Sequence, residues 1–408
     1  MNKDSWRLKQ GFWMGLGLLL TGLALQLTVG PIRWEWLAYP VNVLVLLVYL
    51  VLILLAFWAR GRVRVLRFQA SYQAAVPALV YAVSLTALMG LLRQTPGTDT
   101  GLLGSLSNML TFWPFVLVYG WISFIVALVA LKQITAFGWQ KLPSLLSHLG
   151  LFVILTAGSL GSADRQQLKM FCEKDRPEWR ALDHRMRTKE LPIGVELKRF
   201  TIEEYPAKLT LSDRRTYPWG AALATVDLEA GSHSAGGMKM GAWQIRIGQV
   251  LDNACPKQQA DSIGFVACSS EGATTAVWVE AVSSARRVSG WIACGSYLYP
   301  AQSLALDSVQ ALTMPPREPK RFASEVRLVG SDGRQVEAVI EVNKPVVFDG
   351  WKIYQYGYDR EKGRWSAYSV LELVADPWMP AVYVGILSLL AGAICLFFRV
   401  QQRKEASE

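Results

Sequence analysis

The sequence predicts a polytopic α-helical membrane protein of about six spans, with a large exported, mainly β domain between spans five and six. Three features predict this class: long charge-free runs, one long polar segment that interrupts them, and basic residues grouped in alternate loops. Each apolar run is long enough to cross a hydrocarbon core of about 30 Å as a helix. The runs cover residues 11–29, 40–58, 71–92, 111–131, 143–161 and 379–398.

These runs divide the chain into three parts. We expect a membrane domain with five transmembrane helices at 1–161, an exported mainly β domain at 162–376, and a final transmembrane helix with a short cytoplasmic tail at 377–408. Pro114 should lie in the first turn of the fourth span, where a missing N–H costs little. The fifth span carries a stripe of small residues that would let another helix approach closely. These residues are Ser147, Gly150, Ala157 and Gly161.

Charge is distributed unevenly along the chain. Outside residues 162–376 there are 14 Lys+Arg and 5 Asp+Glu, whereas inside them there are 28 and 27. The basic excess therefore flanks the spans, and it indicates contact with a lipid bilayer and not with nucleic acid. Because positive loops stay cytoplasmic, we expect a bacterial inner-membrane protein with both termini cytoplasmic and the large domain periplasmic. The basic residues expected on the cytoplasmic side are Lys3, Arg7, Lys9, Arg60, Arg62, Arg64, Arg67, Lys132, Lys141, Arg399, Arg403 and Lys404. The short loops expected on the opposite side hold only Arg33 and Arg93.

The polar segment changes its pattern along its length. Residues 164–190 are charged, with Trp179, Leu182 and Met186 at helical spacing, and they predict a surface helix or two. From Leu191 onward apolar and polar residues alternate, and turn residues separate short runs, which is typical of a β-sandwich or barrel. The loop-like, proline-rich stretch at 300–320 would divide this domain into halves. Further strand-like runs lie at 221–228, 242–250, 275–282, 290–299, 323–330, 335–342, 351–356 and 366–374.

Four cysteines lie in the expected exported domain, and Cys395 lies in the last span. An oxidising compartment would allow one or two disulfides, and Cys255 with Cys268 is the favoured pair because it closes a short loop. A membrane thiol oxidoreductase that uses these cysteines is a weaker alternative, since the sequence has no C-x-x-C. The P-loop, G-x-S-x-G, H-E-x-x-H and dinucleotide motifs are also absent from the sequence, so no catalytic residues are predicted.

His148 is the candidate binding residue, because it is the one ionisable side chain in the run LPSLLSHLGLFVILTAGSLG. An ionisable ring inside a membrane span requires a partner, a cavity or a metal. It either hydrogen-bonds a neighbouring helix or a backbone carbonyl, or it ligates haem iron. No other span contains His, so a second ligand would come from a partner chain, or the iron would be five-coordinate.

The other two histidines, His184 and His233, have no second His or Cys pair nearby in the sequence. We expect both to be solvated surface residues. We expect the tryptophans of the polar segment to lie on strands and to be buried in the core of the β domain. They are Trp179, Trp219, Trp243, Trp278, Trp291, Trp351 and Trp365.

Several segments together resemble the ResB proteins, also called CcsB. LPIGVELKRFTIEEYP (191–206) is similar to the opening of that family's exported domain. The segment at 342–359 resembles its "VN-x-P…G…YQ…Y" motif through Asn343, Pro345, Gly350, Tyr354, Gln355 and Tyr358. SVLELVADPW, with Asp376-Pro377, resembles the exit strand, and SHLGLFVILTAGSLGS resembles the preceding span. The likeness runs from about Leu145 to the C-terminus, whereas the N-terminal spans have no counterpart, since the family commonly has three spans before this domain.

The resemblance implies cytochrome c biogenesis by system II. A ResB-like subunit would work with a ResC/CcsA-like membrane partner, move haem b across the membrane and deliver it to apocytochrome c. By resemblance His148 would be one axial haem ligand, and the chain would be an assembly factor, at most part of a haem-attachment complex. The family's Trp-rich segment belongs to the partner. The alternative is a membrane-anchored scaffold whose exported domain docks apocytochrome or another exported protein without binding haem.

Overall fold

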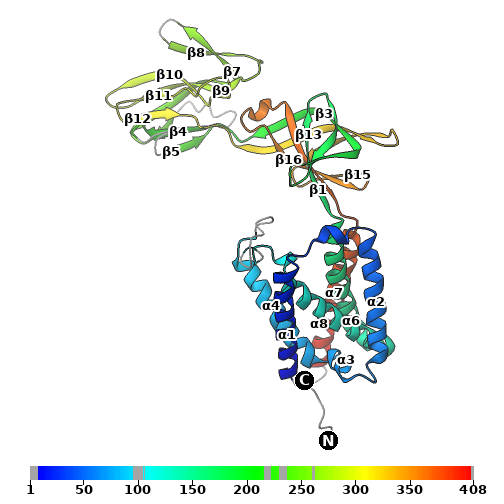
Figure 1. Cartoon of the computed structure of the whole chain (residues 1–408). Helices are drawn as coiled ribbons and strands as arrows, with labels where there is room; N and C mark the ends of the chain where they lie inside the picture. The colour runs from blue at the N-terminus through cyan, green and yellow to red at the C-terminus, as the bar shows by residue number, and fades with distance from the viewer. Residues whose placement is uncertain are drawn as a thin grey trace. The chain divides into compact units, whose positions relative to one another are not determined.

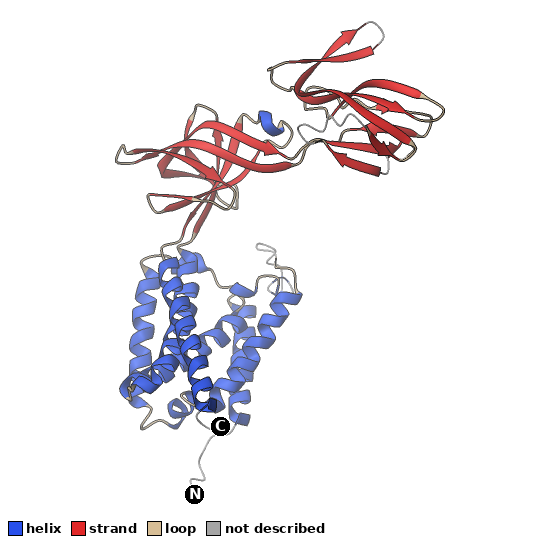
Figure 2. Cartoon of the chain, turned by 180° about the vertical axis from the view of Figure 1, so that it is seen from behind, coloured by secondary structure: helices blue, strands red, loops and turns tan. Residues whose placement is uncertain are grey.

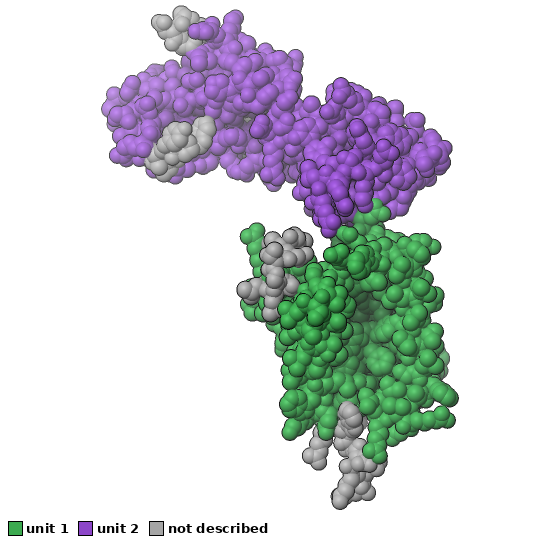
Figure 3. All heavy atoms as spheres, in the orientation of Figure 1, with its two compact units in different colours: residues 1–166, 375–408 green, residues 167–374 purple. Residues whose placement is uncertain are grey.

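The computed structural model describes residues 8–94, 104, 106–215, 222–228, 237–259 and 262–405. The chain forms two compact units, residues 1–166 with 375–408, and residues 167–374 (Figure 3). The first unit is helical and the second is built of strands (Figure 2). The β unit is therefore inserted into the helical unit between its last two long helices.

Six helices of the helical unit have the length and apolar composition to cross a membrane. Each coincides with one of the six apolar runs, so the predicted fold class is confirmed and the chain is a multi-pass membrane protein. The spans are carried by α1 (Leu8–Thr28), α2 (Val41–Ala59), α4 (Tyr72–Leu91), α6 (Trp113–Thr135), α7 (Leu142–Leu160) and α8 (Met379–Glu405) (Figure 1). A short helix, α3 (Arg64–Gln69), joins α2 to α4.

Helix α6 lies at the centre of the helical unit. Its residues Val118, Trp121 and Ile125 are buried against α4 and against apolar side chains of α1 and α7. The indole of Trp121 donates a 2.8 Å hydrogen bond to Gln69, so the buried polar groups of this core satisfy one another. Pro114 lies in the first turn of α6, as its position in the sequence predicted.

The last two spans pack closely because small residues face one another. A Cβ at Gly150 of α7 would come within 2.5 Å of the carbonyl oxygen of Gly385 on α8. At Gly161 a Cβ would meet the side chain of Trp378, and at Gly392 it would meet Ser147. The predicted small-residue stripe of the fifth span is therefore confirmed as a helix-packing surface, and α8 is the helix that it meets.

The segment at 164–190 is not helical, and the prediction of a surface helix there was wrong. It forms strands β1 (Gln166–Glu173) and β2 (Pro177–Leu182). In β1 the buried residues Leu168, Met170 and Cys172 alternate with more exposed neighbours, which is the strand period. Strand β2 pairs with its sequence neighbours β1 and β3, whereas β1 also pairs with the distant strand β17, and helical spacing of three apolar residues does not reveal such pairing.

The first sheet of the β unit has eight strands, in the order β14-β13-β3-β2-β1-β17-β16-β15. Strand β14 also approaches β15 and β16, so the sheet curls into a nearly closed barrel. Its interior holds buried residues such as Ile193, Leu328 and Leu371. The remaining strands of this sheet are β3 (Thr188–Glu204), β13 (Pro319–Gly330), β14 (Gln335–Glu341), β15 (Val346–Phe348), β16 (Trp351–Tyr358) and β17 (Tyr368–Ala375).

Two smaller sheets form a sandwich. One has the order β11-β12-β4-β5 and the other β10-β9-β7-β6, with β8 paired to β7. Leu211 and Leu312 of the first sheet and Val279 and Ile292 of the second belong to one buried cluster. The strands are β4 (Lys208–Asp213), β5 (Ala222–Asp227), β6 (Met238–Met240), β7 (Trp243–Gln259), β8 (Ser262–Ala267), β9 (Thr274–Val282), β10 (Arg287–Ala293), β11 (Leu304–Ala305) and β12 (Gln310–Thr313).

The chain passes between barrel and sandwich twice, at residues 205–207 and 314–318. The N–H of Tyr205 donates a 2.9 Å hydrogen bond to the carbonyl of Glu318, so the two links lie side by side. The segment at 300–320 thus contains one of these links. The prediction that all of it is a loop was wrong, because it also holds β11, β12 and the start of β13.

Candidate functional site

The imidazole of His148 lies in the second turn of α7 and is half-buried. Its Nδ1 lies 2.6 Å from the carbonyl oxygen of Ser144, one turn earlier. A carbonyl only accepts, so Nδ1 carries the proton and Nε2 of the neutral ring keeps its lone pair. Nε2 has no hydrogen-bond partner among the described residues. The predicted bond to a backbone carbonyl is therefore present, and it leaves the second nitrogen open.

A short polar chain continues from His148 to α6. The hydroxyl of Ser144 lies 3.4 Å from Nδ1 and accepts a 2.9 Å hydrogen bond from Nε2 of Gln133. The Oε1 of Gln133 is buried and has no donor in the part of the chain that the structure describes. This arrangement fixes the ring and its tautomer, as groups behind a ligating histidine commonly do.

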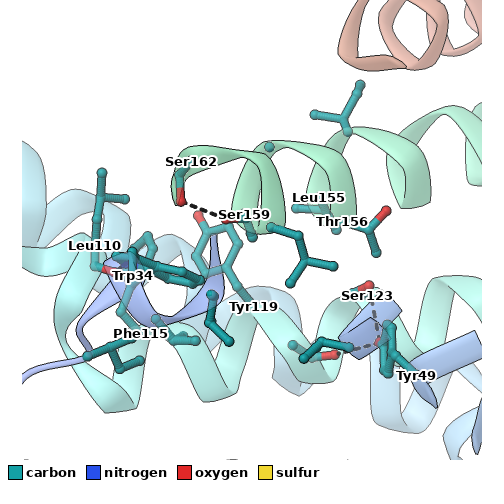
Figure 4. A pocket seen from close by; sticks show the side chains of 18 of the residues that line it. Trp34, Tyr49, Leu110, Phe115, Tyr119, Ser123, Leu155, Thr156, Ser159 and Ser162 are labelled. Atoms are coloured by element: carbon teal, nitrogen blue, oxygen red, sulfur yellow. Dashed lines mark hydrogen bonds between the residues drawn. The ribbon is translucent and has the colours of Figure 1, made fainter. Parts of the chain in front are cut away.

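A crevice of about 870 Å³ opens between α2, α6 and α7 (Figure 4). This volume is within the range of sites for small molecules and cofactors, about 300–1,000 Å³. Its walls are apolar and aromatic, with a few hydroxyls and no charged side chain. The lining includes Trp34, Leu44, Tyr49, Leu52, Trp113, Phe115, Tyr119, Ser123, Leu155, Thr156, Ser159 and Ser162.

Most hydroxyls of the crevice already have partners. Tyr49 donates to Ser123 at 3.2 Å, and Ser162 donates to the carbonyl of Ser159 at 2.7 Å (Figure 4). Thr156 donates to the carbonyl of Phe152 on its own helix, also at 2.7 Å. The walls therefore present mainly apolar surface. The sequence interpretation missed this site, because its residues come from three helices and only their packing assembles them.

His148 does not line the crevice, although α7 forms one of its walls. The nearest lining residue of α7 on the same face, Leu155, is seven residues further, or about 10 Å along the helix axis. Phe152 lies between them and stacks on Tyr49, with ring centroids 6.4 Å apart. The crevice lining thus contains no histidine, and the open Nε2 of His148 lies outside it.

A polar cluster at the C-terminal end of α7, formed by Asn42 and Asp164, was also missed by the sequence interpretation. Asn42 of α2 is fully buried, and its amide donates to Oδ2 of Asp164 at 2.7 Å and to the carbonyl of Leu160 at 3.1 Å. Asp164 also accepts from the backbone N–H of Tyr39 at 2.7 Å. A lone Asn in the apolar run VNVLVLLVYLVLILL was the signal, because a buried amide in a span needs a partner.

Cys255 and Cys268, the pair favoured from the sequence, form a disulfide with Cα atoms 5.8 Å apart. Cys172 and Cys294 are free and buried. Burial raises the pKa of the Cys172 thiol strongly, and it raises the pKa of Cys294 to about 12. Thiols that stay protonated are poor nucleophiles, so these two give no support to thiol–disulfide chemistry.

The remaining candidates do not converge on a site. His184 is exposed in the turn between β2 and β3, and no group of three metal-ligating side chains occurs among the described residues. Trp243 and Trp351 are core residues, but the core prediction was wrong for Trp179 and Trp278, which are 38% and 37% exposed. Trp291 and Trp365 are half-buried. His233 and Trp219 lie outside the described residues.

The motif at 342–359 has a structural role. Asn343 and Gly350 have φ values of 62° and 82° and form the turns on either side of β15. Gln355 is buried in a hydrogen-bond network with Ser324 and Ser369. Tyr358 packs on Phe200 and Phe322, with ring centroids 5.2 and 5.1 Å apart. These residues build the barrel.

The model of the ResB-like family matches residues 264–368, about a quarter of the chain. The match runs from β8 to the start of β17 and contains the 342–359 motif. It confirms the ResB-like resemblance over these residues. The similar segments at 147–162, 191–206 and 369–378 lie outside the match and stay predictions. No curated protein matches the chain.

Proposed function

We propose that this protein is a haem-handling subunit of cytochrome c biogenesis, with Nε2 of His148 as one axial ligand of haem b. The observation that carries the proposal is the open Nε2 of His148, whose ring is oriented by the hydrogen bond at Nδ1. The ResB-like match of the same chain supports it. Haem is the cargo, and the protein contributes a neutral imidazole inside a span, held by Ser144 and Gln133.

In this proposal the chain works with a ResC/CcsA-like membrane partner. No other span has a histidine, so the partner provides the second axial ligand and the groups that present haem to apocytochrome c. Both termini lie in the cytoplasm and the β unit in the periplasm of a bacterial inner membrane. The basic loop between α2 and α4, with Arg60, Arg62, Arg64 and Arg67, supports this orientation.

The ligand role is tested by absorption spectroscopy on the full chain, purified with and without its partner. His148→Ala should lose haem or change its axial ligation, and added imidazole should restore the spectrum at least partly. His184→Ala is the matched control, because it removes an exposed imidazole from the β unit and should leave the spectrum unchanged.

Two results would reject the ligand role: a complex that contains no haem, or a His148→Ala complex with unchanged haem content and ligation. Capture of apocytochrome c by a haem-free complex would instead favour the scaffold alternative.

A further inference from the structure

The crevice between α2, α6 and α7 is held open at both ends. At one end Asn42 of α2 is bonded to Leu160 and Asp164. At the other end Tyr49 stacks on Phe152, and Ile53, only 3% exposed, packs on Ala127 and Leu128. Because α2 is fixed on both sides, it cannot close against the other helices. The space between them therefore requires an occupant.

Water is a poor occupant of this space. A buried water needs about two to four polar partners. The hydroxyls of Tyr49, Thr156 and Ser162 already donate to protein acceptors, and the rest of the lining is mainly aliphatic and aromatic. No lining side chain is charged. Such walls favour an apolar ligand.

The depth of the crevice matches one leaflet. Its lining runs from Leu44 to Leu52 on α2, and from Ile154 to Ser162 on α7. At 1.5 Å per residue each stretch rises about 12 Å, close to half of a hydrocarbon core of about 30 Å. This is the reach of one lipid acyl chain that enters from the membrane surface at the C-terminal end of α7.

A cation lies at the mouth of the crevice. Arg33 is exposed, stands between the lining residues Ile32 and Trp34, and has its guanidinium carbon 5.3 Å from the ring of Trp36. It has no ion-pair partner among the described residues. A basic side chain at membrane-surface depth attracts anionic lipid headgroups. The other basic residues in the loops at this end of the helices are Arg93 and Arg165.

We propose that this crevice is a lipid-binding site, which holds an acyl chain of one anionic phospholipid while Arg33 pairs with its phosphate. The site is separate from His148 and does not depend on haem handling. The bound lipid fills the gap between α2 and the rest of the helical unit, and so completes its packing.

Two glycines allow a sharp test. Gly120 and Gly158 line opposite walls of the crevice, and a Cβ at either position meets no atom within 4 Å. Leucine at either position would fill the crevice without touching the backbone of another helix. Gly17 on α1 is the matched control, because its Cβ is equally unobstructed and it does not line the crevice.

The experiment is native mass spectrometry of the delipidated full chain, titrated with phosphatidylglycerol. The wild type and Gly17→Leu should each retain one tightly bound lipid. Gly158→Leu and Gly120→Leu should each weaken binding by at least about tenfold, the effect of displacing two buried methylene groups. Arg33→Gln should weaken binding about fivefold and reduce the preference over phosphatidylcholine.

A wild-type chain that retains no lipid would overturn the proposal, as would folded crevice variants that bind lipid like Gly17→Leu. Co-purification of haem that is lost in Gly158→Leu would assign the crevice to haem instead. Circular dichroism shows which variants keep their helical content, and the two glycines give independent tests if one variant does not fold.

Discussion

The indole of Trp378 donates a 2.7 Å hydrogen bond to the carboxylate of Asp164, which lies 214 residues earlier in the chain. Asp164 follows the end of α7, and Trp378 directly precedes α8. The bond therefore joins the two connecting segments by which the chain enters and leaves the β unit. Although burial by itself raises the pKa of Asp164, hydrogen bonds from Tyr39, Asn42 and Trp378 lower it overall below its usual value. The carboxylate therefore stays ionised and holds α2, α7 and α8 together.

We expect Trp378→Phe to destabilise the helical unit by about 1–2 kcal/mol, because it removes one hydrogen bond to a charged acceptor. Asp164→Ala should cost more, since it also leaves the buried amide of Asn42 without one acceptor. Unfolding of the full chain in mixed micelles, followed by circular dichroism, measures both. Equal stability of wild type and Asp164→Ala would show that this cluster contributes nothing.

Gly150→Ala should separate α7 from α8. The new methyl group would lie 2.5 Å from the carbonyl oxygen of Gly385 and 2.6 Å from the backbone nitrogen of Leu389, and neither backbone can move without shifting the helix. Gly17→Ala on α1 is the control, because its methyl group meets no atom within 4 Å and Gly17 does not line the crevice. The control should be neutral or stabilising by up to about 1 kcal/mol through helix propensity. Equal effects of the two substitutions on unfolding in mixed micelles would contradict the observed packing.

Gln355→Leu should destabilise the β unit by about 2–3 kcal/mol, because it removes the hydrogen bonds of Gln355 to two buried hydroxyls, which keep only their bond to each other. Ser324 donates to Gln355 at 2.6 Å, and Gln355 donates to Ser369 at 2.9 Å. Tyr356→Phe, one residue away on the exposed face, removes only a surface bond to Lys169 and should have little effect. A double-mutant cycle with Ser369→Ala measures the coupling, and additive effects would argue against a network.

Asp183 should make the β unit sensitive to acid. Hydrogen bonds from the backbone N–H groups of Arg187 and Arg185, together with the Arg187 side chain, lower the pKa of Asp183 to about 2. Since the folded pKa is below the unfolded value of about 3.9, its stabilisation is present above pH 4 and is lost as the pH falls to about 2. The difference in Tm between wild type and Asp183→Asn should therefore shrink over that range. A difference that does not change with pH would show that ionisation of Asp183 is not involved.

The free thiols of Cys172 and Cys294 should resist alkylation in the native state, because they are buried and their pKa values are raised. Iodoacetamide should label both only after unfolding, as mass spectrometry of peptides from the β unit would show. The disulfide of Cys255 and Cys268 should remain unlabelled until it is reduced. Rapid native labelling of Cys172 or Cys294 would revive the thiol oxidoreductase alternative.

The sequence and the structure agree best where the signal is local. A run such as residues 40–58 must be a helix in a membrane, because only internal hydrogen bonds satisfy its backbone there, and α2 begins and ends within a residue of it. The small-residue stripe around Gly150 also follows from one helix alone. Strands β1 and β2 could not be recognised in this way, because their partners β17 and β3 complete their hydrogen bonds.

The sequence by itself determined the number of spans, the place of the inserted β unit and the choice of His148, since each depends on apolar length or on one misplaced polar residue. Only the tertiary structure decided where the crevice lies and why Asp164 stays charged. Those properties arise from side chains of separate helices that meet in space, and the order of residues along one helix does not specify its neighbours.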